Sequence, residues 1–482
     1  MKNFTLIMII MISIAVGIFL FIGSVYVRKY ITARELMKYI NAEYSDYLPL
    51  PYHLFTPSSI RTMIGEALPE LYPLLDDKMM ERVYRQGMLK NKIQVEFAKT
   101  PPSSDNKIIE YMDKTGLLAE LKTTPAGALK KIQSIDLLRH ALKAKSPYAE
   151  YYPSSTPDGE VVLPAEFTPI KAVLLQWPIY YNYNWILHAQ LTEAITTGNA
   201  EAHIVIPNEY WQKGVELYLS MNNISLKRIR FIHAPIDNVW VRDCGPTAVY
   251  QKKTGKMCLI ANPYLPNGEP YHKRDQEIPV EIGRYYGNPV YRLPFVIEGG
   301  NIISDGKGTS IMFDSVLKRN PDMTVETIKS ILKSYFGINR LIMLECLTGE
   351  ITGHVDMVVR FINTDTVMVA KSEPGYKWHK DFETIASKLS KEHSSNDKMY
   401  TVIRVPIADN DNDSVNFWSY INSLIVNDVV IVPIFGVPQD SIALDIYRKA
   451  MPNYKIISIK MSNYQVGSVH CQTKEIPFMK IE

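Results

Sequence analysis

The sequence has few cysteines and little net charge. Its 482 residues include only Cys244, Cys258, Cys346 and Cys471, and no two of them lie at the C-x-x-C spacing of a metal site. A zinc site is therefore not expected, and neither is a disulfide scaffold in a chain of this size. By default we expect each cysteine to be a small buried apolar residue.

The sequence also lacks nucleotide-binding motifs and the large positive net charge that would attract nucleic acid. No G-x-G-x-x-G or Walker sequence follows a strand-like run, which argues against the usual nucleotide-binding folds. The formal net charge is +3, from 53 basic and 50 acidic side chains, so no nucleic acid partner is expected. With 46% hydrophobic residues the chain can bury one large core or two ordinary ones.

One long hydrophobic run is present at the N-terminus. Residues 4–27 carry no charge and are numerous enough to span a bilayer. We interpret residues 1–30 as an uncleaved transmembrane signal anchor, because the apolar run is long for a signal peptide and its cleavage site is weak. A cleaved signal and a buried helix remain alternatives. We expect the rest of the chain to be membrane-anchored and extracytoplasmic, although Lys2, Arg28 and Lys29 flank the run almost symmetrically and leave its orientation open.

The next part, residues 31–160, is predicted to be mainly helical. Apolar residues recur every three or four positions in "ARELMKYINAEY" and "ALKKIQSIDLLRHALK". The stretch "SPYAEYYPSSTPDGE" is typical of a linker, because proline, serine and glycine cluster there. A domain boundary near residue 160 follows, and no group of residues before it indicates a chemical role.

After residue 160 the pattern changes to short apolar strands. Runs such as "KAVLLQWP", "AHIVIP", "VDMVVRFI" and "VVIVPIFG" recur at near-regular intervals, and "VETIKSILKSYF" and "SIALDIYRKAM" are helical between them. The count and spacing predict an α/β domain over residues 161–482. We expect a repeated unit of strands plus one helix around an axis, not a Rossmann sheet.

Four segments of this domain carry polar residues with chemical potential. In "DNVWVRDCGPTAVY", Trp240, Arg242 and Asp243 are predicted at a strand end before a turn, where an aspartate is ordinarily a cap. In "VIEGGNIISDGKGT", Glu298 precedes two glycines.

In "GEITGHVDMVVRF", His354 and Asp356 are two residues apart, so on a strand both point to one face. Burying them there is costly unless they find partners. In "VGSVHCQTKEIP", His470 and Cys471 are adjacent, and a strand would put them on opposite faces. His470 is then a poor base for Cys471, and His354 is the better candidate.

Together these segments resemble the agmatine deiminase and bacterial (Porphyromonas-type) peptidylarginine deiminase family of the guanidine-modifying, or pentein, superfamily. The resemblance runs from "PAEFTPIKAVLLQWP" through "WVRDCGP", "EGGNI", "DGKGT" and "GHVDM" to "HCQTKEIP", in this order. It implies a five-bladed α/β propeller with a polar central active site, and it implies nothing for residues 1–160.

The resemblance also implies roles for individual residues. Cys471 is the expected nucleophile, His354 the general acid and base, Asp243 and Asp356 the clamp for the guanidinium group, and Glu298 the residue that orients the histidine. The remaining expected substrate contacts are Trp240, Arg242 and Asn422. No metal and no organic cofactor are expected.

The implied reaction is hydrolysis of a guanidinium group to a ureido product and ammonia. Two carboxylates suit a planar cation because they can hold it by bidentate, charge-assisted hydrogen bonds. Small substrates such as agmatine are slightly favoured, because Glu298 follows the pattern of the enzymes that act on agmatine and free arginine. Action on arginine side chains of proteins, an amidinotransferase and an inactive membrane-tethered binding module remain alternatives.

Overall fold

The computed structural model describes residues 156–178, 185–207, 212, 215–216, 218–220, 222–236, 238–264, 274–408, 417–461 and 468–478. The chain divides into two compact units. The larger one, Leu137–Pro178, Leu187–Asn208 and Lys227–Glu482, contains every described strand. The smaller one, Met1–Asp136, Ile179–Ile186 and Glu209–Leu226, contains few described residues. The predicted anchor and nearly all of the predicted helical region 31–160 lie outside the described residues.

No helix within the described ranges is both long enough and apolar enough to cross a membrane. The uncharged run at residues 4–27 lies outside those ranges, so the anchor stays a prediction.

The described strands form five small sheets. In chain order the strands are β1 (Val161–Val162), β2 (Ile170–Gln176), β3 (Glu201–Ile206), β4 (Ile229–His233), β5 (Thr247–Gln251), β6 (Met257–Ala261), β7 (Val290–Arg292), β8 (Ile303–Ser304), β9 (Thr309–Phe313), β10 (Arg340–Leu344), β11 (Val359–Asn363), β12 (Thr366–Lys371), β13 (Thr401–Ala408), β14 (Trp418–Ser419), β15 (Leu424–Val426), β16 (Val429–Ile434), β17 (Lys455–Lys460) and β18 (Lys474–Pro477). The sheet orders are β18-β2-β3-β4, β1-β5-β6-β7, β10-β9-β8, β11-β12-β13-β14 and β15-β16-β17.

Every sheet repeats one plan, an antiparallel pair followed by a helix and a parallel strand. The antiparallel pairs are β18/β2, β5/β6, β8/β9, β11/β12 and β15/β16, and the parallel pairs that follow are β2/β3, β6/β7, β9/β10, β12/β13 and β16/β17. The helices between the parallel strands are α7 (Trp185–Thr197), α10 (Ile278–Tyr286), α12 (Val325–Phe336), α13 (His379–Leu389) and α14 (Gln439–Ala450). The predicted unit of strands plus one helix is therefore present five times.

Helix α12 shows why these residues form this unit. The Thr324 side chain accepts a hydrogen bond from the Thr327 backbone N–H and caps the first turn. Ile328 and Leu332 lie on one buried face at helical spacing. Gly337 ends the helix at φ 69°, and a Cβ atom there would lie 1.9 Å from the Val161 carbonyl oxygen, so only glycine fits.

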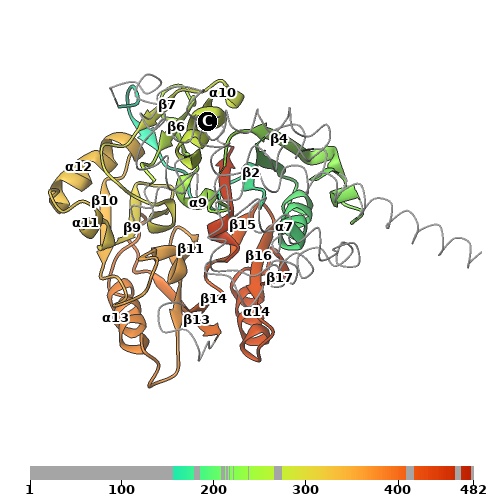
Figure 1. Ribbon diagram of the computed structural model, residues 1–482. Helices are drawn as coiled ribbons and strands as arrows, with labels where there is room; N and C mark the ends of the chain where they lie inside the picture. The colour runs from blue at the N-terminus through green and yellow to red at the C-terminus, as the bar shows by residue number, and fades with distance from the viewer. Residues whose placement is uncertain are drawn as a thin grey trace, which may run out of the picture. The chain divides into compact units, whose positions relative to one another are not determined.

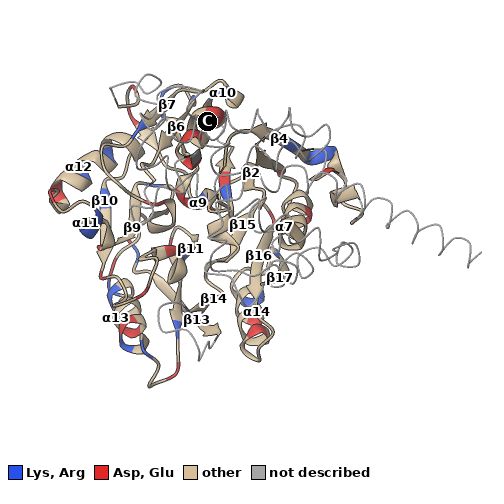
Figure 2. Ribbon diagram, in the orientation of Figure 1, with Lys and Arg blue, Asp and Glu red and all other residues tan. Residues whose placement is uncertain are grey.

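The helices pack on the sheets with their polar sides outward. Figure 1 shows α12, α13 and α14 on the outer side of their sheets, with the short helix α9 (Val241–Cys244) nearer the middle. Acidic and basic side chains are interspersed on α13 and α14 (Figure 2). Cys258 is 1% exposed and belongs to the apolar core beneath α12, as expected for a structural cysteine.

Three local predictions were wrong. Asp243 lies in the one-turn helix α9, not at a strand end. His354 precedes a 3-10 turn, η10 (Val355–Met357), and Cys471 lies in another, η11 (His470–Gln472), where extended strands were predicted. These segments connect one sheet to the next, and a single helical turn redirects the chain there, which an extended strand cannot do. The argument that His354 and Asp356 share a strand face therefore fails.

Candidate active site

The polar residues singled out in the sequence come from the connections between sheets. Asp243 lies between β4 and β5, Glu298 between β7 and β8, His354 with Asp356 between β10 and β11, Asn422 between β14 and β15, and Cys471 between β17 and β18. Each of these connections leaves one sheet and enters the next. Helix α9 packs against η9 (Gly299–Asn301) and η11, and η9 packs against η10, so these connections meet.

His354 and Glu298 form the tightest pair of this group. His354 Nε2 lies 2.6 Å from Glu298 Oε2, and His354 is 6% exposed. Burial alone would lower the pKa of His354, but Asp243, the hydrogen bond to Glu298 and the charges of Glu298 and Asp356 outweigh burial and raise it to about 10. At neutral pH His354 is therefore a cation that can donate a proton.

Glu298 is itself held from its other side. Arg319 Nη2 lies 2.7 Å from Glu298 Oε2 and Arg319 Nη1 donates to Oε1 at 3.0 Å. Burial raises the pKa of Glu298, but the bond with His354 and the charges of His354 and Arg319 lower it below its ordinary value. Glu298 is thus an ionised group within hydrogen-bond distance of the His354 ring, and its orienting role stays a prediction.

Asp243 approaches the opposite nitrogen of the same ring. Its Oδ1 lies 3.8 Å from His354 Nδ1 and accepts a hydrogen bond of 2.9 Å from the Gly300 N–H. A Cβ atom on Gly300 would lie 2.6 Å from His354 Nδ1, so the glycine allows this approach. Burial, together with the charges of Glu298 and Asp356, raises the pKa of Asp243 to about 6 although His354 opposes the shift.

Asp356 pairs with His470. Its Oδ2 lies 2.6 Å from His470 Nδ1, and within the described part of the chain its buried Oδ1 has no hydrogen-bond partner. Burial raises the pKa of Asp356, but the bond to His470 and the neighbouring positive charges lower it below its usual range. Asp356 is therefore an ionised carboxylate whose Oδ1 has no hydrogen-bond partner among the described residues.

Cys471 is 4% exposed and lies beside both aspartates. Its backbone N–H donates to Asn422 Oδ1 at 3.3 Å, which places Asn422 next to the thiol as the sequence predicted. Burial and the negative charges of Asp356 and Asp243 raise the pKa of Cys471 well above its ordinary value. In the empty site Cys471 is a neutral thiol, and a cation between the two aspartates would favour the thiolate.

The structure assigns Arg242 to ion pairs. Its guanidinium donates to Glu475 at 2.9 Å, to Glu166 at 3.3 Å and to the His470 carbonyl at 3.1 Å, and the residue is 3% exposed. This placement favours a structural role over the predicted contact with a substrate. Trp240 is half-buried at the start of α9, where its backbone N–H donates to the Asn238 side chain.

Sequence reasoning missed Glu166 and gave His470 no role beyond that of a poor base. His470 Nε2 lies 2.7 Å from Glu166 Oε1, and Glu166 also pairs with Arg360 at 2.8 Å. The available signal was an acid in the apolar opening segment "PAEFTPIKAVLLQWP", next to a strand that is buried at six of its seven positions.

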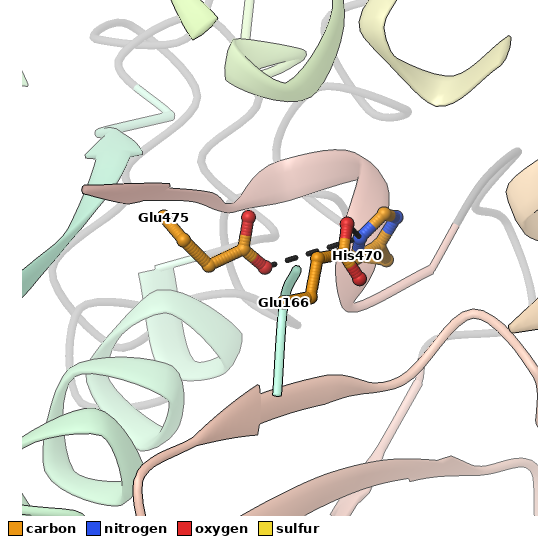
Figure 3. A group of neighbouring side chains, drawn as sticks. All are labelled: Glu166, His470 and Glu475. Atoms are coloured by element: carbon orange, nitrogen blue, oxygen red, sulfur yellow. Dashed lines mark hydrogen bonds and ion pairs between the residues drawn. The ribbon is translucent and has the colours of Figure 1, made fainter. Parts of the chain in front are cut away.

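Glu166, His470 and Glu475 lie close enough to be considered as metal ligands. One donor atom of each lies within 4.8 Å of the others (Figure 3). Both carboxylates, however, pair with the Arg242 guanidinium, and Glu166 pairs with Arg360 as well. Because these cations already neutralise the two carboxylates, we interpret the group as an ion-pair network.

Comparisons with known proteins give the same family as the sequence motifs. A candidate agmatine deiminase of Vibrio parahaemolyticus is 28% identical over 369 residues, which cover 67% of this chain and 99% of that protein. The solved agmatine deiminase of Enterococcus faecalis superposes with a TM-score of 0.59 at 23% identity, over 67% of this chain and 98% of that one. The solved structure of a candidate arginine deiminase of Porphyromonas gingivalis superposes with a TM-score of 0.58 at 24% identity, over 66% of this chain and 98% of that one.

The two solved structures confirm the predicted pentein-type α/β fold, and the family itself is shown by a direct match. Residues 162–477, well over half of the chain, match the model of the Porphyromonas-type peptidyl-arginine deiminases. The match begins one residue after the start of β1 and ends with the last residue of β18, so it spans all five sheets and all five connections of the site. This chain therefore belongs to the Porphyromonas-type peptidyl-arginine deiminase family.

Proposed function

We propose that this chain hydrolyses the guanidinium group of a small, agmatine-like substrate to a ureido product and ammonia through a covalent intermediate on Cys471. Members of this family are hydrolases that act on C–N bonds in linear amidines, and the chain is such an enzyme. The observation that carries the proposal is the convergence of Cys471, His354 with Asp356, Glu298 and Asp243 from four different connections between sheets.

The two aspartates supply the binding step. A guanidinium carbon is a poor electrophile because three nitrogens share its charge, so the cation must be held in place for attack. Asp356 has a lowered pKa and Asp243 a pKa of about 6, so both are largely ionised at neutral pH, and one buried oxygen of Asp356 has no hydrogen-bond partner among the described residues. Two such carboxylates can each accept hydrogen bonds from the planar cation.

The bound cation then activates the nucleophile. Burial and the two aspartates hold Cys471 as a neutral thiol in the empty site. A guanidinium between the aspartates cancels their charge and brings a positive charge beside the sulfur, which lowers the pKa of Cys471. The thiol proton passes to solvent, and the thiolate forms only when the guanidinium is bound beside it.

His354 serves both halves of the reaction. The Cys471 thiolate attacks the guanidinium carbon and forms a C–S bond, and the electron pair of one C=N bond moves onto nitrogen. His354, protonated at neutral pH, donates its proton as the C–N bond breaks and ammonia leaves. The neutral imidazole then takes a proton from a water that attacks the thiouronium carbon and forms a C–O bond. The C–S bond breaks with its electron pair moving to sulfur, and the proton of the new hydroxyl passes to that sulfur, which releases the ureido product and restores the Cys471 thiol.

The arrangement of the five sheets belongs to the same proposal. We propose that they surround a common axis as the blades of a propeller, with the active site at its centre. In support, each sheet has the same strand and helix plan, and the residues from successive connections meet at one place. Five blades around an axis bring all five connections to the centre.

The substrate is expected to be a small guanidino compound. Purified protein should turn over a small guanidino compound such as agmatine or free arginine with a higher kcat/KM than an arginyl peptide, because Glu298 is a charged orienting residue of the type found in agmatine and free-arginine deiminases. A colorimetric assay for ureido products on the three substrates measures the comparison. Citrulline in the peptide with no product from agmatine would instead establish a protein-arginine deiminase.

Residues 1–30 are proposed to tether the enzyme to a membrane, with the enzyme on the extracytoplasmic side. The uncharged run at residues 4–27 supports this, because its length matches the apolar core of a bilayer. The full chain should therefore sediment with membranes and need detergent for release, whereas a variant lacking residues 1–30 should be soluble and active. Release of the full chain by high salt alone would contradict a spanning anchor, and protease protection in sealed vesicles reports the side.

A further inference from the structure

His470 joins two carboxylates inside the protein. It is 0% exposed, and its Nδ1 lies 2.6 Å from Asp356 while its Nε2 lies 2.7 Å from Glu166. Figure 3 shows the ring of His470 facing the Glu166 carboxylate. These two contacts link Glu166, in the segment before β2, through His470 to Asp356, one of the two aspartates proposed to hold the substrate.

Both ring nitrogens of His470 have a carboxylate as their neighbour. Burial raises the pKa of Glu166, but the charges of His470, Arg360 and Arg242 bring it well below its ordinary value, and the pKa of Asp356 is lowered as well. The ring therefore lies within hydrogen-bond distance of one carboxylate on each side, Asp356 at Nδ1 and Glu166 at Nε2.

The bond to His470 also orients Asp356. It engages Oδ2, and Oδ1 is buried without a partner in the described part of the chain. A carboxylate is planar, so fixing one oxygen fixes the direction of the other. An unpaired buried acceptor is costly in the empty protein and is satisfied when a cationic donor binds.

Glu166 holds the His470 ring on the side opposite Asp356. Its two oxygens contact Arg242 at 3.3 Å and Arg360 at 2.8 Å in addition to His470. Arg360 in turn donates to the Ile421 carbonyl oxygen at 3.0 Å, next to Asn422. The carboxylate is thus tied to three other parts of the fold and cannot turn away from the ring.

We propose that His470 and Glu166 are positioning residues: the buried His470 ring, held by Glu166, fixes Asp356 so that its second carboxylate oxygen is presented to the guanidinium of the substrate. This inference rests on the proposed function, since it concerns the same site. It assigns His470, the neighbour of the nucleophile, to the binding of the substrate and not to proton transfer with Cys471.

Two amide replacements of His470 separate this role from packing. The Asn amide nitrogen takes the place of Nδ1 and can still donate to Asp356, whereas the Gln amide nitrogen takes the place of Nε2 and can reach only Glu166. Binding of agmatine is measured by calorimetry in a Cys471→Ser background, where no turnover occurs. His470→Gln should raise Kd at least about tenfold, and His470→Asn by about threefold or less.

Glu166→Gln provides a second variant, because it keeps a hydrogen-bonding side chain beside the ring and removes the negative charge that Arg242 and Arg360 hold in place. It should also raise Kd, by about three- to tenfold. His203→Gln is the matched control. His203 is 1% exposed and its ring contacts Glu201 at 2.9 Å and Tyr286 at 2.7 Å, away from the site. Its replacement should lower Tm without changing Kd.

A Kd for His470→Gln equal to that of His470→Asn, or closer to the parent, would overturn the inference, because packing alone favours the larger amide. The same holds if Kd is unchanged in Glu166→Gln. If the parent chain neither turns over nor binds agmatine or an arginyl peptide, the proposed function itself fails and the inference falls with it. Turnover by the parent with no difference between the two His470 variants refutes the inference alone.

Discussion

Cys471→Ser is expected to lose at least about four orders of magnitude in kcat, because a serine hydroxyl cannot replace a thiolate that forms the covalent intermediate. The substitution removes no packing volume of note, so the fold should be kept. Steady-state assay of the ureido product measures the loss, and the thermal unfolding midpoint checks that the protein is intact. Retention of more than about a hundredth of the activity would remove Cys471 from the role of nucleophile.

The same residue should react selectively with a cationic alkylating agent. A haloacetamidine carries an amidinium that the two aspartates can hold beside the sulfur, so Cys471 should be labelled faster than by the neutral haloacetamide. The other cysteines serve as internal controls in peptide mass spectrometry. Cys346 is partly exposed and should show the opposite preference, or none, while Cys244 and Cys258 are buried. Equal labelling of all four would contradict the assignment.

His354→Ala should reduce kcat by about two to four orders of magnitude, since it removes the proton donor and acceptor of both steps. Asp356→Ala should also reduce activity severely, through KM as well as kcat, because it takes away one side of the clamp. His393→Ala, an exposed histidine, is the control and should behave like the parent. Near-normal turnover by His354→Ala would exclude it from the mechanism.

Glu298→Gln refines this prediction by changing the charge beside His354 while keeping a hydrogen-bonding side chain. This substitution should reduce kcat less than His354→Ala does. Glu298 helps to raise the pKa of His354 to about 10, so its neutralisation lowers that pKa and leaves Asp243 as the main remaining negative neighbour. The alkaline limb of the kcat profile, where the proton donor is lost, should therefore move to lower pH. An unmoved limb would show that another group gives the proton.

The candidate site was largely predictable from the sequence, but only as a set. Glu298, His354 and Cys471 were each ambiguous alone, because a lone buried acid, histidine or cysteine is ordinarily structural. Their order and flanking glycines carried the signal, since Gly300 is needed for Asp243 to approach His354. The repeated strand and helix unit was also visible, because strands such as β16 are continuous apolar runs.

The missed features depend on contacts between distant parts of the chain. The prediction of strands around His354 and Cys471 used a local period of two, and nothing local reveals that these residues lie where the chain passes from one sheet to the next. Glu166 and His470 are 304 positions apart, and their pairing is fixed by the closure of the first sheet. No spacing rule connects them, so the position of His470 behind Asp356 emerged only from the structure.

The pairing of β18 with β2 has a consequence for how the protein is made on the ribosome. Lys474 pairs with Leu174, so the first sheet stays open at one edge until nearly all of the described chain has been synthesised. Cys471 precedes β18 by three residues and is therefore synthesised just before this strand. Contacts this far apart in sequence slow folding and leave strand edges exposed meanwhile. A chain cut short before Cys471 lacks both the proposed nucleophile and β18, so we expect such a fragment to have no deiminase activity.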